Sequence, residues 1–386
     1  MKVVFLTGTR ADYGKLKPLM QVCERDADIE NHIFVTGMHL QPEYGYTVDE
    51  IKKDNYENLY IPSEYRPQNK MELNLADTII AFSPYVARIK PDIIVVHGDR
   101  VEPLAGSIVG VMNNVKVAHI EGGEITGTAD EFMRHAITKL CHLHFVANDE
   151  AKLRLLQLGE TEQAIHVIGS PDIDIMLSDG LPSLTTVKHE FNLTYDKYAI
   201  LIYHPVTTSK NLRGEAEAVT DAVKEAKRNF IVIKPNNDTG SDIIAGSLRS
   251  LYNNPHFRLF PSLPFEKFLT LLRHADFIIG NSSAGIREAC VYGVPSIDIG
   301  SRQNKRFHAR ALPNVQHCTE NKDAILNCID LVDNYRHTSF YFGDGHSAER
   351  FLRAIKHTHD ISLQKEFVDT RETTAAINNY INEVCF

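Results

Sequence analysis

The stretch VKVAHIEGGEITGTADEFMRH (115–135) has the pattern of a strand, a polar loop and the start of a helix. Its first six residues form an apolar run of the kind that buried strands contain. Glu121 and Glu124 flank two glycines directly after this run, and Asp130 and Glu131 follow a second turn. A buried strand that leads through a polar turn into a helix is the repeating unit of a parallel α/β sheet.

The same order recurs on both sides of this stretch. In the first half of the chain the other strand-like runs are VVFLTG (3–8), HIFVTG (32–37), DIIVVHG (92–98) and LHFVAN (143–148). Helical patterns separate them, including YGKLKPLMQVCE (13–24) and MELNLADTIIAFSPYVARI (71–89). Apolar strands that alternate with helices predict a parallel sheet that is covered on both faces.

A second series of strands follows residue 180. The segment SPDIDIMLSDGLPSL (170–184) contains turn formers and little periodicity, which favours a connection between domains. Strand-like runs then resume as YAILIYHP (198–205), RNFIVIKPN (228–236), FRLF (257–260), DFIIGNSS (276–283) and VPSIDIG (294–300). We therefore predict two Rossmann-like, doubly wound α/β domains, over 1–180 and 181–350, with an interdomain cleft. Residues 351–386 are expected to form a helical tail that packs back toward the first domain.

The composition is that of a globular protein, with 386 residues of which 43% are hydrophobic and 24% are charged. A net charge of −9 disfavours nucleic acid and anionic membranes as partners. No apolar run reaches the ~20 residues of a membrane span, and the start MKVVFLTGTR indicates a first strand rather than a signal peptide. Six scattered cysteines favour free thiols in a reducing cytoplasm.

Polar motifs follow the predicted strands with regularity. Ligands bind beyond the carboxyl ends of strands in open parallel sheets, so these motifs together indicate an active site rather than unrelated polar loops. They are TGTRADYGK (7–15), HGDR (97–100), HIEGGE (119–124), HPVTT (204–208), PNNDTG (235–240), NSSAGIRE (281–288) and GSRQ (300–303).

Two of these motifs are suited to binding phosphate. Ser282 and Ser283 are expected to lie at the start of a helix, where hydroxyls and free N–H groups bind anions. The alternative for this pair is an ordinary helix cap. Glu288 lies farther into that helix, where a carboxylate is placed to accept hydrogen bonds from a ribose diol. Arg10 and Lys15 are candidates for the charge of a pyrophosphate.

No cofactor is predicted from the motifs. Neither G-x-G-x-x-G nor G-x-x-x-x-G-K-[ST] occurs in the chain, which weakens nicotinamide and P-loop interpretations. A metal is the alternative that the His-Asp and His-x-Glu pairs raise. It is disfavoured because HGD and HIE place successive side chains on opposite strand faces and no H-x-x-x-H helix is present.

Together the motifs resemble those of the hydrolysing UDP-N-acetylglucosamine 2-epimerases. The matching segments are TGTRADYGKLKPL, HGDR, HIEGGEITGTADEFMRHAITKL, HPVTT, PNNDTG and GNSSAGIREA, and the resemblance extends to YFGDG (341–345). Related non-hydrolysing enzymes typically carry TRPE and HVEAG, where this chain has TRADYGK and HIEGGE. The resemblance implies a GT-B fold, a UDP-sugar substrate and a homodimer or homotetramer.

The resemblance also implies a reaction, in which UDP-N-acetylglucosamine and water give N-acetylmannosamine and UDP for sialic acid or a related surface sugar. Elimination of UDP gives 2-acetamidoglucal, and rehydration then inverts C2. Such chemistry requires a base, an acid and groups that stabilise the leaving diphosphate. Crowded carboxylates can supply the first two, because crowding drives their pKa values apart.

Site residues follow from the match of motifs. The catalytic carboxylates are Asp99, Glu121 and Asp130, with acid and base not assigned individually, and Arg134 and Arg100 orient them or bind phosphate. For the substrate the resemblance implies Arg10, His204, Asn236, Ser282, Ser283, Glu288 and Arg302 toward UDP, with Lys15 and His39 toward the sugar. The alternatives are that Asp130 only caps its helix and that His97, His119 and His135 are structural.

Other functions fit the same predicted fold. A GT-B glycosyltransferase would share the UDP site and transfer the sugar to an acceptor. A nucleotide-sugar sensor is disfavoured, because binding an anionic substrate does not call for clustered acids. Among epimerases, UDP-2,4-diacetamido-2,4,6-trideoxyglucose of the legionaminic acid route is an alternative substrate, since no residue distinguishes a C4 hydroxyl from a C4 acetamido pocket.

Overall fold

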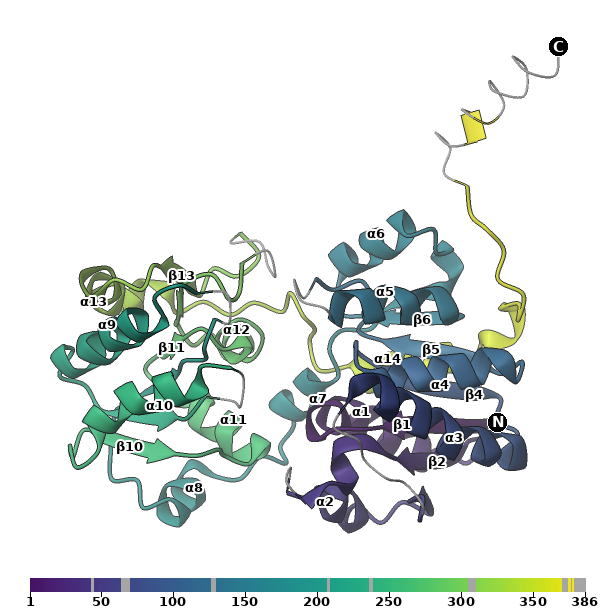
Figure 1. The fold of residues 1–386 in the computed structure, drawn as a ribbon, viewed down its shortest axis with the longest axis horizontal. Helices are drawn as coiled ribbons and strands as arrows, with labels where there is room; N and C mark the ends of the chain where they lie inside the picture. Colours follow the sequence, from purple (N-terminus) through teal and green to yellow (C-terminus); the bar gives the residue numbers. More distant parts are fainter. Residues whose placement is uncertain are drawn as a thin grey trace. The chain divides into compact units, whose positions relative to one another are not determined.

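The structure is a computed structural model that describes residues 1–42, 45–63, 70–125, 130–206, 209–235, 239–304, 310–369, 374, 375 and 377. The chain divides into two compact units, shown in Figure 1. Unit 1 contains Met1–Asp174 and Gly343–Phe386, and unit 2 contains Ile175–Phe342. The divisions thus fall after 174 and 342, whereas the boundaries expected from the sequence are 180 and 350.

Unit 1 is built on a seven-stranded parallel sheet with the order β3-β2-β1-β4-β5-β6-β7. Its strands are β1 Lys2–Thr7, β2 Glu30–Val35, β3 Asn58–Tyr60, β4 Ile93–His97, β5 Lys116–Ile120, β6 Leu143–Val146 and β7 Ile165–Val167. Its helices are α1 Arg10–Glu24, α2 Val48–Lys53, α3 Met71–Ile89, α4 Val101–Met112, α5 Asp130–Leu140, α6 Asp149–Gln157 and α14 Ser347–Ile355. α7 Asp172–Leu177 begins in this unit.

Both faces of this sheet are buried. Along β1, Val3 and Phe5 belong to one hydrophobic cluster, while Val4 and Leu6 belong to another. Successive side chains of a strand point to opposite faces, so a strand that is covered on both sides has to be apolar at every position. This explains why β1 and its neighbours are continuous apolar runs in the sequence.

The C-terminal part of unit 1 completes one of these clusters. Phe351 and Ile355 of α14 are fully buried beside β1 and α1, and Figure 1 shows α14 next to the strands of this unit. The Phe351 ring lies 4.8 Å from that of Phe145 and 6.0 Å from that of Phe5, measured between centroids. Asp174 caps α14 by accepting N–H bonds from Ser347 and Ala348, at 3.0 and 2.8 Å.

Unit 2 repeats the architecture with a six-stranded parallel sheet of order β10-β9-β8-β11-β12-β13. Its strands are β8 Ala199–Ile202, β9 Phe230–Ile233, β10 Phe257–Phe260, β11 Ile278–Gly280, β12 Ser296–Ile299 and β13 Val315–Cys318. Its helices are α8 Leu184–Glu190, α9 Leu212–Glu225, α10 Ser241–Leu248, α11 Phe265–Arg273, α12 Glu288–Val291 and α13 Lys322–Asp330. Two doubly wound parallel α/β domains, as predicted from the sequence, are confirmed. No helix in the described residues is both long enough and apolar enough to cross a membrane.

Candidate active site

Glu121 is the centre of a polar cluster in unit 1. It directly follows β5, and its Oε1 accepts a hydrogen bond of 2.8 Å from Lys15 Nζ of α1 and another from Ser170 Oγ. Its Oε2 accepts from His97 Nε2, at the end of β4, at 3.1 Å. Lys15 also donates to Asp172 Oδ2 at 3.1 Å. The carboxyl ends of parallel strands share one edge of a sheet, and this arrangement brings together residues that are far apart in the sequence.

The backbone of Glu121 is held in a strained conformation. Its φ is +61°, in the left-handed region that non-glycine residues rarely adopt. The Glu121 N–H donates to Phe145 O at 2.8 Å, and its carbonyl accepts from Arg134 Nη1. Gly123 follows with a φ of +75°, where an added Cβ would lie 2.4 Å from Ala151 O. Strain of this kind persists where the surroundings fix it and is concentrated at functional sites.

Arg134 joins Glu121 to a second carboxylate. Arg134 is 5% exposed on α5, and its Nη2 forms an ion pair with Asp99 Oδ2. The single guanidinium therefore fixes Asp99 and the Glu121 backbone relative to one another. Asp130 is the half-buried first residue of α5, four positions before Arg134, and thus lies on the same side of the helix. The structure brings three of the four residues predicted as catalytic into direct contact and places the fourth one turn away.

His119 supports this cluster from within the sheet. Its side chain is fully buried, and Nε2 donates to Gly98 O at 2.8 Å while Nδ1 lies 3.4 Å from Thr138 Oγ1. Burial lowers the pKa of His119 well below its usual value. The ring is thus neutral and structural, which the sequence raised as an alternative. His135 is half-exposed and lies 3.9 Å from Glu131.

His39 forms part of a separate buried cluster. It is fully buried, with Nε2 3.0 Å from Thr7 Oγ1 and Nδ1 2.7 Å from Thr47 Oγ1. Asp12 accepts from Thr7 and from the Gly8 and Thr9 N–H groups. Burial raises the pKa of Asp12, but His39 and these donors lower it below its usual range overall. Both His39 nitrogens face protein hydroxyls, so the ring fixes the turn between β1 and α1.

Two predicted arginines of unit 1 are exposed. Arg10 begins α1, and its Nε lies 3.2 Å from Glu50 Oε2. Arg100 precedes α4, and its Nε lies 3.5 Å from Glu102 Oε2. Glu102 is almost fully buried against Gly8 and Gly37, and burial raises its pKa. The guanidinium of Arg100 is therefore anchored close to the ends of β1 and β4 with half of its side chain still exposed.

In unit 2, Asn281 connects three strand ends. Its side chain accepts from the His204 N–H at 2.7 Å and donates to the His204 carbonyl at 2.8 Å. Its own carbonyl accepts from Arg302 Nη1 at 3.2 Å and Gln303 Nε2 at 2.8 Å. Asn281 is fully buried, so it holds His204 and Arg302 next to the end of β11. Two of the predicted UDP-side residues are thereby brought to the same edge of the second sheet.

The serine motif follows the same strand, but it does not begin a long helix. Ser282 precedes a 3-10 turn over Ser283–Gly285, and its Oγ accepts from the Ala284 N–H at 3.3 Å. Glu288 then begins α12, which ends at Val291. The expectation of one helix with two serines at its start is thus replaced by two short helical turns. Asn236 lies outside the described residues.

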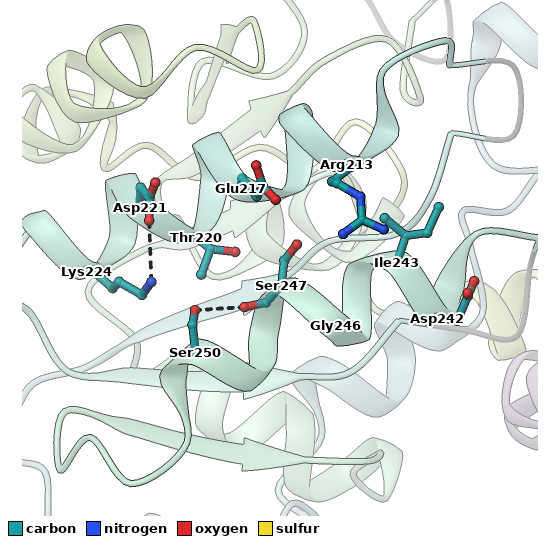
Figure 2. A pocket seen from close by; sticks show the side chains of 10 residues that line it. All are labelled: Arg213, Glu217, Thr220, Asp221, Lys224, Asp242, Ile243, Gly246, Ser247 and Ser250. Carbon is teal, nitrogen blue, oxygen red and sulfur yellow. Dashed lines mark hydrogen bonds and ion pairs between the residues drawn. The ribbon is translucent and has the colours of Figure 1, made fainter.

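A groove between α9 and α10 lies apart from the strand ends that carry the predicted site residues of unit 2 (Figure 2). It measures about 330 Å³ and runs along two helices. Its charged groups pair locally, as in the 3.4 Å contact of Lys224 with Asp221, and Ser250 Oγ donates to Ser247 O at 2.8 Å. None of the predicted site residues lines it. Within the described residues, no group of three or more His, Cys, Asp and Glu side chains is arranged to hold a metal ion.

The comparison with known proteins agrees with this geometry. The sequence profile described as UDP-N-acetylglucosamine 2-epimerase matches residues 21–356. The chain belongs to this epimerase family. The UDP-N-acetylglucosamine 2-epimerase of Neisseria meningitidis serogroup B is 45% identical over 95% of this chain and 99% of its own. The hydrolysing UDP-N,N'-diacetylbacillosamine 2-epimerase of Legionella pneumophila is 34% identical over 92% and 95%.

Solved structures of epimerases share the fold. The Neisseria meningitidis UDP-GlcNAc 2-epimerase bound to UDP-GlcNAc superposes with a TM-score of 0.79, at 19% identity, over 92% of this chain and all of that one. The chain thus shares its GT-B-like fold, with two parallel-sheet α/β domains, with solved epimerases. Four residues of the two clusters were missed among the predicted site residues: Ser170, Asp172, Asn281 and Gln303. Asn281 and Gln303 fall within motifs that the sequence singled out, NSSAGIRE and GSRQ, whereas Ser170 and Asp172 do not.

Proposed function

We propose that this protein is a hydrolysing UDP-N-acetylglucosamine 2-epimerase, which converts UDP-N-acetylglucosamine and water into N-acetylmannosamine and UDP. The observation that carries the proposal is the cluster at the sheet edge of unit 1. There Glu121 is held by Lys15 and His97 next to the Asp99–Arg134 pair. Family membership supports the substrate, which the 45% identical Neisseria relative has in its name.

The first step is an elimination. As the C1–O bond to UDP lengthens, positive charge develops at C1 and makes the C2 hydrogen more acidic. One ionised carboxylate of the cluster takes this proton, and the C2–H electrons form the C1=C2 double bond. The electron pair of the C1–O bond leaves with UDP. The products are 2-acetamidoglucal, UDP and a protonated carboxylic acid.

The second step is an addition of water. The water oxygen bonds to C1 and its proton passes to a basic group, while a carboxylic acid of the cluster gives a proton to C2 from the opposite face. The product is N-acetylmannosamine, inverted at C2. Asp99, Glu121 and Asp130 are the groups that we propose for these transfers. Arg134 keeps Asp99 in position through their ion pair.

Unit 2 is proposed to hold the diphosphate. His204 and Arg302 converge on Asn281, and Ser282 and Ser283 follow it directly, so donors and positive charge gather at one strand end. Charge-assisted hydrogen bonds to the leaving diphosphate stabilise the charge that develops as C1–O breaks.

The 34% identical Legionella relative favours one alternative substrate, UDP-2,4-diacetamido-2,4,6-trideoxyglucose. The same elimination and addition would apply to it, because C1 and C2 carry the same groups. Sialic acid biosynthesis is the proposed context for the first substrate and legionaminic acid biosynthesis for the second.

The test is a reaction in D₂O without an acceptor, followed by NMR with each of the two UDP-sugars. We expect free UDP and N-acetylmannosamine with deuterium at C2. Release of a UDP-linked mannosamine would indicate the non-hydrolysing reaction. Failure to release UDP without an acceptor would indicate a glycosyltransferase. A higher kcat/KM with the diacetamido sugar than with UDP-N-acetylglucosamine would favour the alternative substrate.

A further inference from the structure

The ammonium of Lys15 lies between two buried carboxylates. Lys15 Nζ is 2.8 Å from Glu121 Oε1 and 3.1 Å from Asp172 Oδ2, and Ser170 Oγ lies 3.1 Å away. The Glu121 and Asp172 side chains are only 6% and 4% exposed. Water screens charges weakly at such depth, so a change in the charge of one carboxylate is felt by the other.

Asp172 reaches this cluster from a different element than the other acids. It is the first residue of α7, two positions after Ser170 and beyond the edge strand β7. Glu121 has to change its protonation state if it takes part in the proposed reaction. Each time Glu121 becomes neutral, Lys15 loses one ion pair, while the contact with Asp172 remains and keeps the ammonium charged and in place.

We propose that Asp172 is a positioning residue, which holds Lys15 beside Glu121 and thereby tunes how readily Glu121 takes up and gives away a proton. The kinetic part of this inference rests on the proposed function, whereas its effect on the titration of Glu121 does not.

The charged groups around Glu121 and Asp172 determine whether the loss of Asp172 raises or lowers the pKa of Glu121. Lys15 comes from α1, His97 from the end of β4, and Arg134 from α5, where it contacts the Glu121 carbonyl and Asp99. Asp174 lies two residues after Asp172 in α7 and is bound to the start of α14. Neutralising Asp172 removes a negative neighbour of Glu121 and ends the competition of Asp172 with Glu121 for the Lys15 ammonium. Both changes favour the ionised form of Glu121.

The decisive experiment compares wild type with Asp172→Asn by ¹³C NMR titration of the side-chain carboxyls, with Glu121→Gln used to assign the Glu121 signal. We expect the midpoint of the Glu121 titration to fall by about one pH unit in Asp172→Asn, as for a carboxylate that gains more of a cation. Asp172→Glu keeps a charge near Lys15 and should restore the midpoint. An unchanged midpoint in Asp172→Asn overturns the proposal. Asp172→Ser, which keeps an acceptor without charge, takes its place if the asparagine variant does not fold.

The kinetic readout separates positioning from a structural role. In Asp172→Asn the limb of the pH profile of kcat that reports Glu121 should move to lower pH with KM unchanged, whereas a structural defect lowers kcat equally at every pH. The matched control is Asp174→Asn, which removes one of the two oxygens that accept the Ser347 and Ala348 N–H groups at the start of α14. It should lower the melting temperature and leave the Glu121 midpoint in place. An equal displacement in both variants would overturn the proposal. If wild type releases no UDP from either sugar, the proposed function fails, and the NMR titration still decides the role of Asp172.

Discussion

Among single residues, we expect substitution of the carboxylates Asp99, Glu121 and Asp130 to have the largest effect on turnover. Asp99→Asn, Glu121→Gln and Asp130→Asn keep the size of each side chain and remove its capacity for proton transfer. We expect turnover to fall by about 10²–10⁴-fold in each variant, the usual contribution of general acid–base catalysis. UDP affinity, measured by calorimetry, should stay close to that of wild type, and at least one variant should release 2-acetamidoglucal.

Glu124→Gln is the matched control for these substitutions, since it removes a carboxylate of the same loop that is not among the proposed catalytic acids. It should retain turnover. Full activity in all three of the amide variants would contradict the site, and equal loss in the control would show that the loop, rather than its acids, matters.

Glu160 supports a prediction about stability. It is 3% exposed and accepts hydrogen bonds from Lys139 and His144 at 2.8 and 2.9 Å. Burial alone would raise its pKa, but His144, Lys139 and Lys365 lower the pKa of Glu160 from 4.5 to about 2. A carboxyl with a depressed folded pKa stabilises the protein above its unfolded pKa. This stabilisation is lost as the pH falls from 4.5 to about 2.

Glu160→Gln should therefore lower the free energy of unfolding at pH 7 by about 3–5 kcal/mol, the usual result of breaking a buried ion pair. The variant should also lose less stability than wild type as the pH falls through that window. Urea unfolding at a series of pH values measures both effects. Glu162→Gln, at the exposed partner of Lys152, is the control and should behave like wild type. Parallel pH curves for wild type and Glu160→Gln would contradict the interpretation.

At the scale of elements, the serine loop between β11 and α12 is expected to bind the diphosphate. Replacing Ser282 and Ser283 together by alanine removes two hydroxyls next to His204 and Arg302. Hydrogen bonds to charged groups are worth roughly 1.5–3 kcal/mol each, so the loss of two should weaken UDP binding in calorimetry by about a hundredfold or more. Ser250→Ala, in the groove of Figure 2, removes an exposed hydroxyl of the same unit and should leave UDP binding unchanged. Equal UDP affinity in the double variant would remove the serines from the site.

The strands also show how much of the fold could be predicted from the sequence. Central strands such as β1, β4 and β5 were located because burial on both faces makes them continuous apolar runs. The three strands that were missed, β3, β7 and β13, lie at the edges of their sheets. Each of them contains half-buried or exposed positions, and no continuous apolar run marks them in the sequence.

The same limit explains the missed site residues. Ser170 and Asp172 follow the unrecognised strand β7, and the sequence around them was interpreted as a connection between domains. Their contacts with Lys15 span more than 150 positions of the chain. The local sequence pattern around a residue does not indicate which distant residue it contacts. The order of the strands in the folded sheet does. Glu121, in contrast, follows a central strand and was found.

For the whole molecule, we predict a homodimer or a dimer of dimers that forms through helices of unit 1. α3 exposes Leu73 and Ile80, seven positions apart and thus on one face, with exposed fractions of 44% and 69%. Ile80→Asp should lower the oligomeric mass measured by light scattering at micromolar concentration. Leu331→Asp, at an apolar residue of unit 2 that is 51% exposed, is the control and should leave the mass unchanged. A monomeric wild type would contradict the prediction.

The return of the chain to unit 1 after Phe342 has a consequence for synthesis on the ribosome. The first 174 residues emerge without α14, so Phe5 and Phe145 lack their ring contacts with Phe351 while all of unit 2 is being translated. At roughly 5–20 residues per second this interval lasts on the order of ten seconds or more. The second unit, encoded without interruption, has all of its own sequence available before the first is complete. We expect nascent chains released at residue 342 to expose the apolar surface that α14 covers and to require chaperones. The part of the protein that is made first is thus the last to become stable.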